Sequence, residues 1–340
     1  MTDAHPADEL FGSLLDAMPS SAYRRHAQQL LRAAVDLVSQ HPSTLDLKIA
    51  AAALEEMGDA FRMFAAAPDL PKVTIFGSAR TQAHDPLYAA AREVAHALAE
   101  EGWMVITGAG PGIMQAGMEG AGREHSIGVS IRLPFEQQAN PIIAGDSKYV
   151  SMKYFFTRKL MLIKESKGFV CLPGGFGTLD ETFELLTLTQ TGKGVPVPIV
   201  FLDVPGDPYW ETVDALVREQ LVVRGLAAEA DRHLYLITDD CQRAISEIIG
   251  FYRNYDSLRY VGDTLVIRLQ RAPTATQMAT LNDRFGHLCQ TGTIHATEPF
   301  GPERRENDQL HLQRIAFVFA KHGYGDLREM IDLCNTFVDG

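Results

Sequence analysis

The stretch GFVCLPGGFGTLDE, residues 168–181, decides the fold class of this chain. Its first five residues form an unbroken apolar run, which is typical of a β-strand buried on both faces. Glycine-rich residues 174–178 follow, and residues 179–189 have the composition of a helix. A buried strand that passes through a glycine-rich loop into a helix is the repeating unit of an α/β protein with a parallel sheet.

The same alternation extends to both sides of this stretch. Further apolar runs predict strands at residues 72–76, 103–107, 126–131, 197–202 and 233–237. Helical patterns cover residues 86–101, 113–124, 153–166, 209–220 and 240–251. Strands that alternate with helices form a parallel sheet through right-handed crossovers, with helices on both faces. We therefore expect a doubly wound, Rossmann-like α/β domain over residues 67–255.

Two further regions flank this domain. Residues 9–65 have helical patterning, strongest at 27–38 and 44–64, and the segment AAPDLP at 66–71 interrupts it. After residue 256 the sequence predicts strands at 264–269, 292–296 and 313–320, helices at 274–288 and 326–337, and a charged loop at 298–308. We expect an N-terminal helical extension (1–66), the α/β domain (67–255) and a small α+β C-terminal region (256–340).

Charge and composition limit the classes of function. The 340 residues include 31 basic and 43 acidic side chains, which gives a net charge of −12 and a pI near 5.4. A surface this acidic disfavours a binder of polymeric nucleic acid, which needs a positive face. It still permits one small basic pocket for a small anion.

The cysteines and the N-terminus indicate the compartment. Cys171, Cys241, Cys289 and Cys334 stand far apart and match no zinc or disulfide spacing, so we expect free thiols in a reducing compartment. Residues 1–10 lack the pattern of a secretory signal, and no apolar run approaches the ~20 residues that span a bilayer. These features predict a cytoplasmic protein without a membrane segment.

The glycine-rich loop at 174–178 has the features of an anion site. Free N–H groups and the positive dipole end of the following helix suit a phosphate, and Thr178 can cap the helix or donate to the same anion. No Lys-Ser/Thr pair follows the glycines, so this is not a Walker A loop. Glu181 stands three residues after Thr178, which also fits a capping box, and the local pattern leaves both roles open.

Two other loops and a basic pair converge on the same predicted crevice. The loops GSAR (Gly77, Ser78) and GAGPG (Gly108, Gly110, Gly112) each follow a strand, although position 113 is Ile and breaks the dinucleotide fingerprint. Arg158 and Lys159 lie on the helix before the PGGFGT loop and could bind phosphate or ribose there. The same pair could equally be solvated surface charges.

Together, the Arg158-Lys159 pair, PGGFGTLDE, GSAR and GAGPGIM resemble the LOG (Lonely Guy) family of cytokinin riboside 5′-monophosphate phosphoribohydrolases. The resemblance covers residues 72–200 and points to a longer bacterial member of a family formerly labelled possible lysine decarboxylase. It implies hydrolysis of a nucleoside 5′-monophosphate to free base and ribose 5-phosphate, without metal or organic cofactor, by a homodimer or higher homo-oligomer.

The resemblance also implies residue roles. Arg158 and Glu181 would be the catalytic pair, while Gly174, Gly175, Gly177 and Thr178 would cradle the 5′-phosphate of a small nucleotide, with Lys159 and the two other loops around it. Longer relatives commonly read GGGPGIMEA where this chain has Ala109 and Gln115, so the accepted base stays open.

A non-catalytic nucleotide-binding or regulatory protein on the same fold is the alternative. Lysine decarboxylation finds no support, because it would normally require a Schiff-base lysine for pyridoxal phosphate, and nothing marks Lys159 or Lys164 as that residue.

Overall fold

The computed structural model describes residues 6–18, 21–133 and 139–338, and the chain divides into two compact units, residues 1–59 and 60–340. In the first unit, α1 (Pro6–Asp16) packs on α2 (Ser21–Ser39), and α3 (Thr44–Ala66) begins there. Ser43 caps α3: its Oγ accepts the N–H of Asp46 at 3.2 Å, and the Asp46 carboxylate accepts the N–H of Ser43 at 3.2 Å. The helical reading of this region is confirmed.

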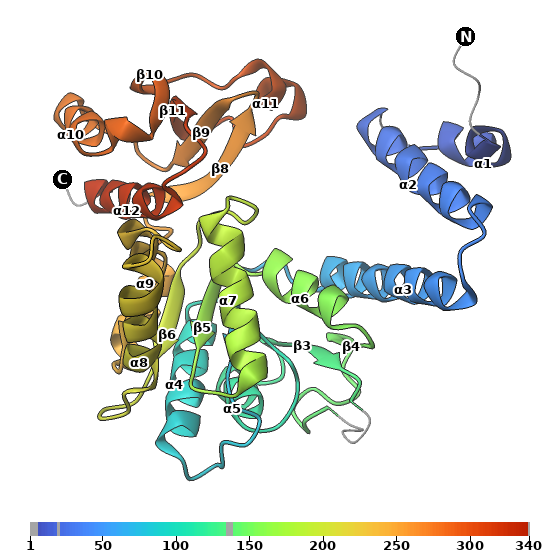
Figure 1. Cartoon of the computed structure of the whole chain (residues 1–340), viewed down its shortest axis with the longest axis horizontal. Coiled ribbons are helices and arrows are strands. Elements are labelled where there is room, and N and C mark those ends of the chain that lie inside the picture. The colour runs from blue at the N-terminus through green and yellow to red at the C-terminus, as the bar shows by residue number, and fades with distance from the viewer. Residues whose placement is uncertain (1–5, 19–20, 134–138, 339–340) are drawn as a thin grey trace. The chain divides into compact units, whose positions relative to one another are not determined.

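The second unit is built on a seven-stranded parallel sheet with the order β4-β3-β2-β1-β5-β6-β7 (Figure 1). The strands are β1 (Lys72–Phe76), β2 (Met104–Thr107), β3 (Ser126–Ile131), β4 (Tyr149–Met152), β5 (Gly168–Cys171), β6 (Ile199–Leu202) and β7 (Leu236–Thr238). The chain passes from β4 at one edge to β5 in the centre, so the order reverses beside β1. The predicted doubly wound, Rossmann-like α/β class is confirmed.

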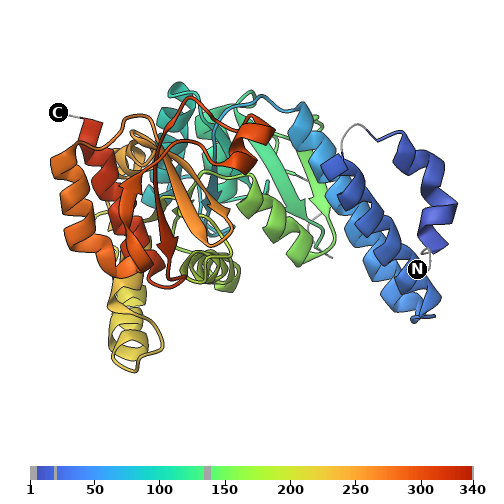
Figure 2. The ribbon, with the colours of Figure 1, turned by 90° about the horizontal axis from the view of Figure 1, so that it is seen from above.

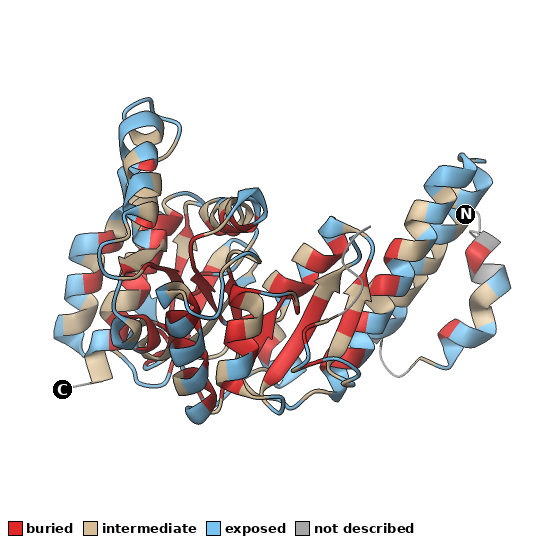
Figure 3. Cartoon of the chain, turned by 90° about the horizontal axis from the view of Figure 1, so that it is seen from below, coloured by how far each residue is buried: buried red, intermediate tan, exposed pale blue. Residues whose placement is uncertain are grey.

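Helices cover both faces of this sheet because successive strand residues point to opposite sides. Val73 and Ile75 face a core shared with α4 (Pro86–Glu100), α5 (Ile113–Ala121) and α9 (Cys241–Gly250). On the opposite face, Thr74 donates to the Leu162 carbonyl of α6 (Phe155–Lys164), and Phe201 stacks on Trp210 of α8 (Tyr209–Leu216). Helix α7 (Phe176–Gln190) also covers this face, and Figure 3 shows the strands largely buried between the layers.

Residues beyond α9 form a second, antiparallel sheet with the order β10-β11-β9-β8. Its strands are β8 (Tyr255–Val261), β9 (Thr264–Leu269), β10 (Cys289–Ala296) and β11 (Gln313–Phe319). Helices α10 (Ala275–Phe285) and α12 (Tyr324–Asn335) lie beside it in Figure 2, and they share an apolar core with Leu265, Ile267 and Phe317. Glu303 of α11 (Gly301–Glu306) is fully buried and pairs with Arg268 and Arg314.

The remaining elements are short helices that follow or precede the elements above along the chain. They are η1 (Val217–Val222), η2 (Glu229–Leu234), η3 (Gly286–Leu288) and η4 (Thr336–Val338). Among the described residues, no helix is long and apolar enough to cross a membrane. All four cysteines are free thiols, as expected.

Some sequence-based elements were wrong in extent. The strands β4 and β8 were not predicted, because YVSM is short and half-exposed at a sheet edge and YDSLRYV interleaves polar residues with apolar ones. The predicted loop at 298–308 contains the short helix α11. Helix α7 begins at Phe176 rather than at residue 179, because Gly175 is its N-cap and Phe176, Gly177 and Thr178 already belong to its first turn.

Candidate active site

A cavity of about 760 Å³ opens at the carboxyl edge of the parallel sheet, where the loops after β1, β2 and β5 meet. This volume is in the range of small-molecule sites, and the edge is where open α/β sheets bind ligands. Most of the predicted site residues line it: Gly77, Ser78, Gly108, Gly110, Arg158, Gly174, Gly175, Gly177, Thr178 and Glu181. Residues from three separate loops and two helices are thus brought to one cavity.

Arg158 and Glu181 form a buried ion pair in this cavity. Arg158 of α6 donates from Nη1 to Oε1 of Glu181 on α7 at 2.9 Å, and from Nε to the Val129 carbonyl at 3.0 Å. Only 8% of Arg158 and 9% of Glu181 is exposed. These two hydrogen bonds fix the orientation of the Arg158 guanidinium. The ion pair therefore keeps one geometry in the wall of the cavity.

Burial has the largest effect on the pKa of Glu181 in this ion pair. It raises the pKa of the Glu181 carboxyl above its ordinary value, while the charges of Arg158 and Lys159 act in the opposite direction. A carboxyl of raised pKa in a cavity, next to a specific cation, is the combination found at acid–base sites.

The glycine-rich loop forms the N-terminal end of α7. Gly175 is the N-cap, and among the described residues no side chain caps the first N–H groups of the helix. A Cβ on Gly174 would lie 2.1 Å from Oγ1 of Thr178, so that position tolerates only glycine. At Gly175 and Gly177 a Cβ would meet nothing within 4 Å, which leaves open space above the helix end.

The start of α7 decides whether Thr178 and Glu181 form a capping box. Because α7 already begins at Phe176, neither Thr178 nor Glu181 occupies a capping position, and α7 has no side-chain cap. The capping-box interpretation of Thr178 and Glu181 is therefore wrong. The Glu181 carboxylate contacts Arg158 instead of its own helix terminus.

The loop after β2 makes room for the arginine. A Cβ on Gly108 would lie 2.3 Å from Nη2 of Arg158, so any side chain there would displace the guanidinium. Ala109 adopts φ 57°, a left-handed conformation that is costly for alanine. Gln115 donates to Glu119 at 2.8 Å and is not among the cavity-lining residues.

Two predicted binding residues stand apart from the lining. The Lys159 ammonium lies 2.7 Å from Asp180 and 2.6 Å from Glu184 of α7, so its charge is matched within the helix pair. Gly112 is the N-cap of α5, and a Cβ there would lie 2.3 Å from the Ser78 carbonyl. In this structure Gly112 allows two strand-end loops to touch, and substrate contact by either residue stays a prediction.

The cavity also includes residues that sequence reasoning missed, among them Arg80, Tyr149, Ser151, Phe155 and Tyr209. Tyr209 donates its hydroxyl to the Gly174 carbonyl at 2.8 Å. Arg80 belongs to the GSAR loop that was singled out, and Tyr209 follows β6, the next strand of the sheet. Their position after parallel strands was a signal that could have identified both.

Comparison with known proteins places the α/β region beside one group of relatives. Residues 112–248 match the family described as "Possible lysine decarboxylase". The cytokinin riboside 5′-monophosphate phosphoribohydrolase LOG of Oryza sativa subsp. japonica is 28% identical over 174 residues, which are 49% of this chain and 68% of that protein. The probable enzyme LOG6 of Arabidopsis thaliana is 32% identical over 36% of this chain and 58% of its own.

The α/β region of this chain is thus similar in sequence to proteins of the LOG family. The chain spans less than two thirds of the length of LOG6 and of the Arabidopsis thaliana relative LOG1, with 58% and 62% covered.

Two solved structures match about half of this chain at low similarity. The molybdenum cofactor carrier protein of Chlamydomonas reinhardtii is 20% identical with a TM-score of 0.37, over 52% of this chain and 94% of that one. DNA processing protein A of Helicobacter pylori is 18% identical with a TM-score of 0.38, over 53% and 81%. Similarity at this level carries no functional argument.

Proposed function

We propose that this protein hydrolyses the N-glycosidic bond of a nucleoside 5′-monophosphate, AMP or a cytokinin riboside monophosphate, to the free base and ribose 5-phosphate. The observation that supports this most directly is the buried Arg158–Glu181 pair beside the open N-terminal end of α7, in one cavity. Such an arrangement offers an anion site and a carboxylate to the two ends of the same ribose phosphate.

The chemistry follows from the charges. The N–H groups at the start of α7 suit the 5′-phosphate, because no described side chain caps them and they carry the positive end of the helix dipole. Cleavage of an N-glycosidic bond passes through a state with positive charge on the ribose, which a nearby carboxylate stabilises. Glu181 performs that role and orients the attacking water, while Arg158 holds the carboxylate in place.

Other activities are less well supported by the residues present. Pyridoxal-dependent decarboxylation requires a lysine amine at the substrate, and the described cavity lining includes no lysine. A binding protein without activity would share the anion site but would have no need for the buried carboxylate.

The test is release of base by the purified full-length chain from AMP and from isopentenyladenine riboside monophosphate, measured by chromatography. We expect Glu181→Gln to lower kcat by about 10²–10³-fold, because one charge that stabilises the transition state is removed. The nucleotide should still bind to this variant in calorimetry, since the α7 terminus is unchanged.

Asp180→Asn is the matched control, because Asp180 is the adjacent carboxylate, its side chain is 61% exposed, and it is absent from the cavity lining. This variant should keep kcat within a factor of a few. Equal activity in wild type and Glu181→Gln would disprove the assigned role. Tight AMP binding without any base release by the wild type would show a binding protein instead.

A further inference from the structure

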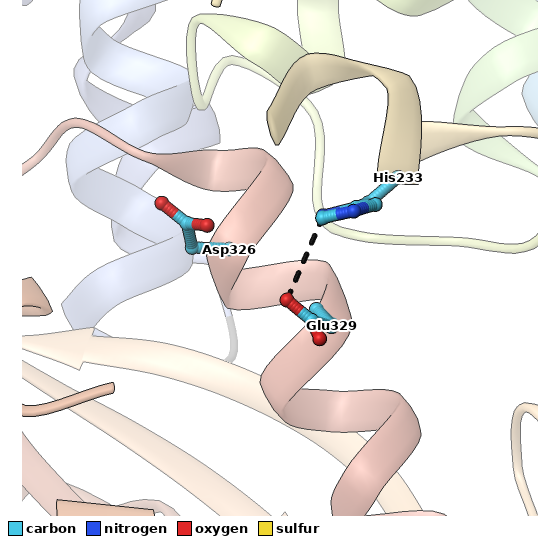
Figure 4. Close-up of side chains that lie close together, drawn as sticks. All are labelled: His233, Asp326 and Glu329. Carbon is cyan, nitrogen blue, oxygen red and sulfur yellow. Dashed lines mark ion pairs between the residues drawn. The ribbon is translucent and has the colours of Figure 1, made fainter. Parts of the chain in front are cut away.

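A second cluster of polar side chains lies away from the cavity, between the parallel sheet region and the C-terminal sheet. It consists of His233 on η2 and Asp326 and Glu329 on α12 (Figure 4). Each residue offers one ligand atom, and these atoms all lie within 4.8 Å of one another. None of the three residues belongs to the cavity lining or takes part in the chemistry proposed above.

The three candidate ligand residues meet on one face of helix α12. Asp326 and Glu329 are three residues apart on α12, so they share a face of the helix. His233 approaches that face from a separate segment, with Nδ1 3.7 Å from Oε2 of Glu329. Ligand atoms around a tetrahedral zinc ion are about 3.3 Å apart, given bonds of ~2.0–2.1 Å, so little movement is needed to bind one.

We propose that His233, Asp326 and Glu329 form a binding site for a divalent transition-metal ion of the zinc type. One imidazole and two carboxylates are a ligand set that such ions accept, and a fourth position is left for water. The cation would also relieve the repulsion between two carboxylates that lie this close together.

Neighbouring residues support the three ligands. The His287 ring on η3 lies 3.2 Å from Oδ2 of Asp326, which is the kind of outer contact that orients a ligating carboxylate. Arg284 donates to Oε1 of Glu329 at 2.6 Å, so Oε2 is the oxygen that faces His233. Arg284 therefore neutralises part of the charge on Glu329 and leaves Asp326 without an arginine or lysine partner among the described contacts.

A bound ion would link the parallel sheet region to the C-terminal sheet region. The segment η2 leads into β7 of the parallel sheet, whereas α12 belongs to the C-terminal sheet region. Gly325 of α12 already packs against the backbone of η2, since a Cβ there would lie 1.9 Å from the Ala230 carbonyl. Metal binding would strengthen this contact and raise the temperature of unfolding, because the ion binds only the folded arrangement.

The experiment is calorimetric titration of the untagged full chain, freed of metal by a chelator, with ZnCl₂. We expect one Zn²⁺ per chain and a higher midpoint of thermal unfolding when zinc is present. His233→Ala and Glu329→Gln should each weaken binding at least tenfold, and His287→Ala should weaken it about 10–100-fold as an outer-contact residue. Circular dichroism before titration verifies that each variant is folded.

His96→Ala is the matched control. His96 forms an exposed pair with Glu100 at 3.5 Å, like the His233–Glu329 pair but outside this cluster. It should leave the zinc affinity unchanged. Absence of stoichiometric zinc binding, or equal affinity in wild type and His233→Ala, would overturn the proposal.

Discussion

Asp203 is a buried carboxyl that makes the stability of the chain depend on pH. It stands directly after β6, is 3% exposed, and accepts the N–H of Trp210 through Oδ2 at 3.0 Å. Among the described residues, its Oδ1 has no hydrogen-bond partner. Burial raises the pKa of this carboxyl from 3.8 to about 6, so folding favours the protonated form.

The sign of the pH effect follows from this shift. Between pH 4 and 6 the folded chain holds a proton on Asp203 that the unfolded chain releases, so the free energy of unfolding falls as the pH rises. We predict that Asp203→Asn raises the free energy of unfolding by about 1–3 kcal/mol at pH 7 and changes it little at pH 4.

Urea unfolding at both pH values measures this difference. Asp239→Asn, at an exposed carboxylate nearby, serves as the control and should stay within about 0.5 kcal/mol of wild type. An equal gain from Asp203→Asn at pH 4 and pH 7 would contradict the assigned cause.

At the scale of elements, β6 and α8 support the glycine-rich loop from outside. Trp210 stacks on Phe201 of β6 with ring centroids 4.3 Å apart, and the Tyr209 N–H donates to Asp207 at 3.1 Å. These contacts fix the start of α8, so the Tyr209 hydroxyl reaches the Gly174 carbonyl at 2.8 Å. Tyr209 is thus a positioning residue for the loop that we propose to bind phosphate.

We predict that Tyr209→Phe raises the KM for the nucleotide by up to about tenfold and changes kcat much less. One hydrogen bond of ~0.5–1.5 kcal/mol that holds the loop is lost, while Arg158 and Glu181 stay in place. Steady-state kinetics separates the two parameters. Tyr235→Phe, whose hydroxyl bonds Asp214 at 2.7 Å outside the cavity lining, should leave KM unchanged. A fall in kcat alone would contradict a positioning role.

Strands that are fully buried were predicted from the sequence, whereas partly exposed strands were missed. The central strands β1, β2, β5 and β6 were predicted because buried strands need continuous apolar residues. The edge strand β4 and the C-terminal strand β8 were missed because partly exposed strands tolerate polar side chains. The start of α7 was placed too late because the sequence does not show at which residue of the glycine-rich segment the helix begins.

At the scale of the whole molecule, Arg328 joins the C-terminal region to the parallel sheet region. This residue of α12 is 3% exposed, donates to the Val197 carbonyl at 3.1 Å, and pairs with Glu247 of α9 and with Asp332. Its guanidinium also lies over the ring of Phe251, 4.5 Å from the centroid. A buried cation with this many partners cannot be removed without leaving charges unpaired.

We predict that Arg328→Met lowers the free energy of unfolding by about 3–5 kcal/mol, because Glu247 and Asp332 lose their buried partner. Chemical denaturation followed by fluorescence measures the loss. Arg218→Met is the control, since Arg218 is half-exposed and forms a salt bridge with the exposed Glu219, and it should cost less than about 1 kcal/mol. Equal losses in the two variants would refute the role of Arg328.

The sequence by itself determined the doubly wound α/β class and the loops that surround the cavity. Buried parallel strands and glycine-rich turns leave local patterns, which is why Gly174, Thr178, Arg158 and Glu181 could be singled out. Only the tertiary structure decided that Glu181 pairs with Arg158 rather than capping α7.

Only the tertiary structure, likewise, paired Lys159 with Asp180 and Glu184, and brought His233 to the carboxylates of α12. The physical reason is that these contacts join side chains from different elements. Their partners depend on how the helices pack, and no local pattern records that.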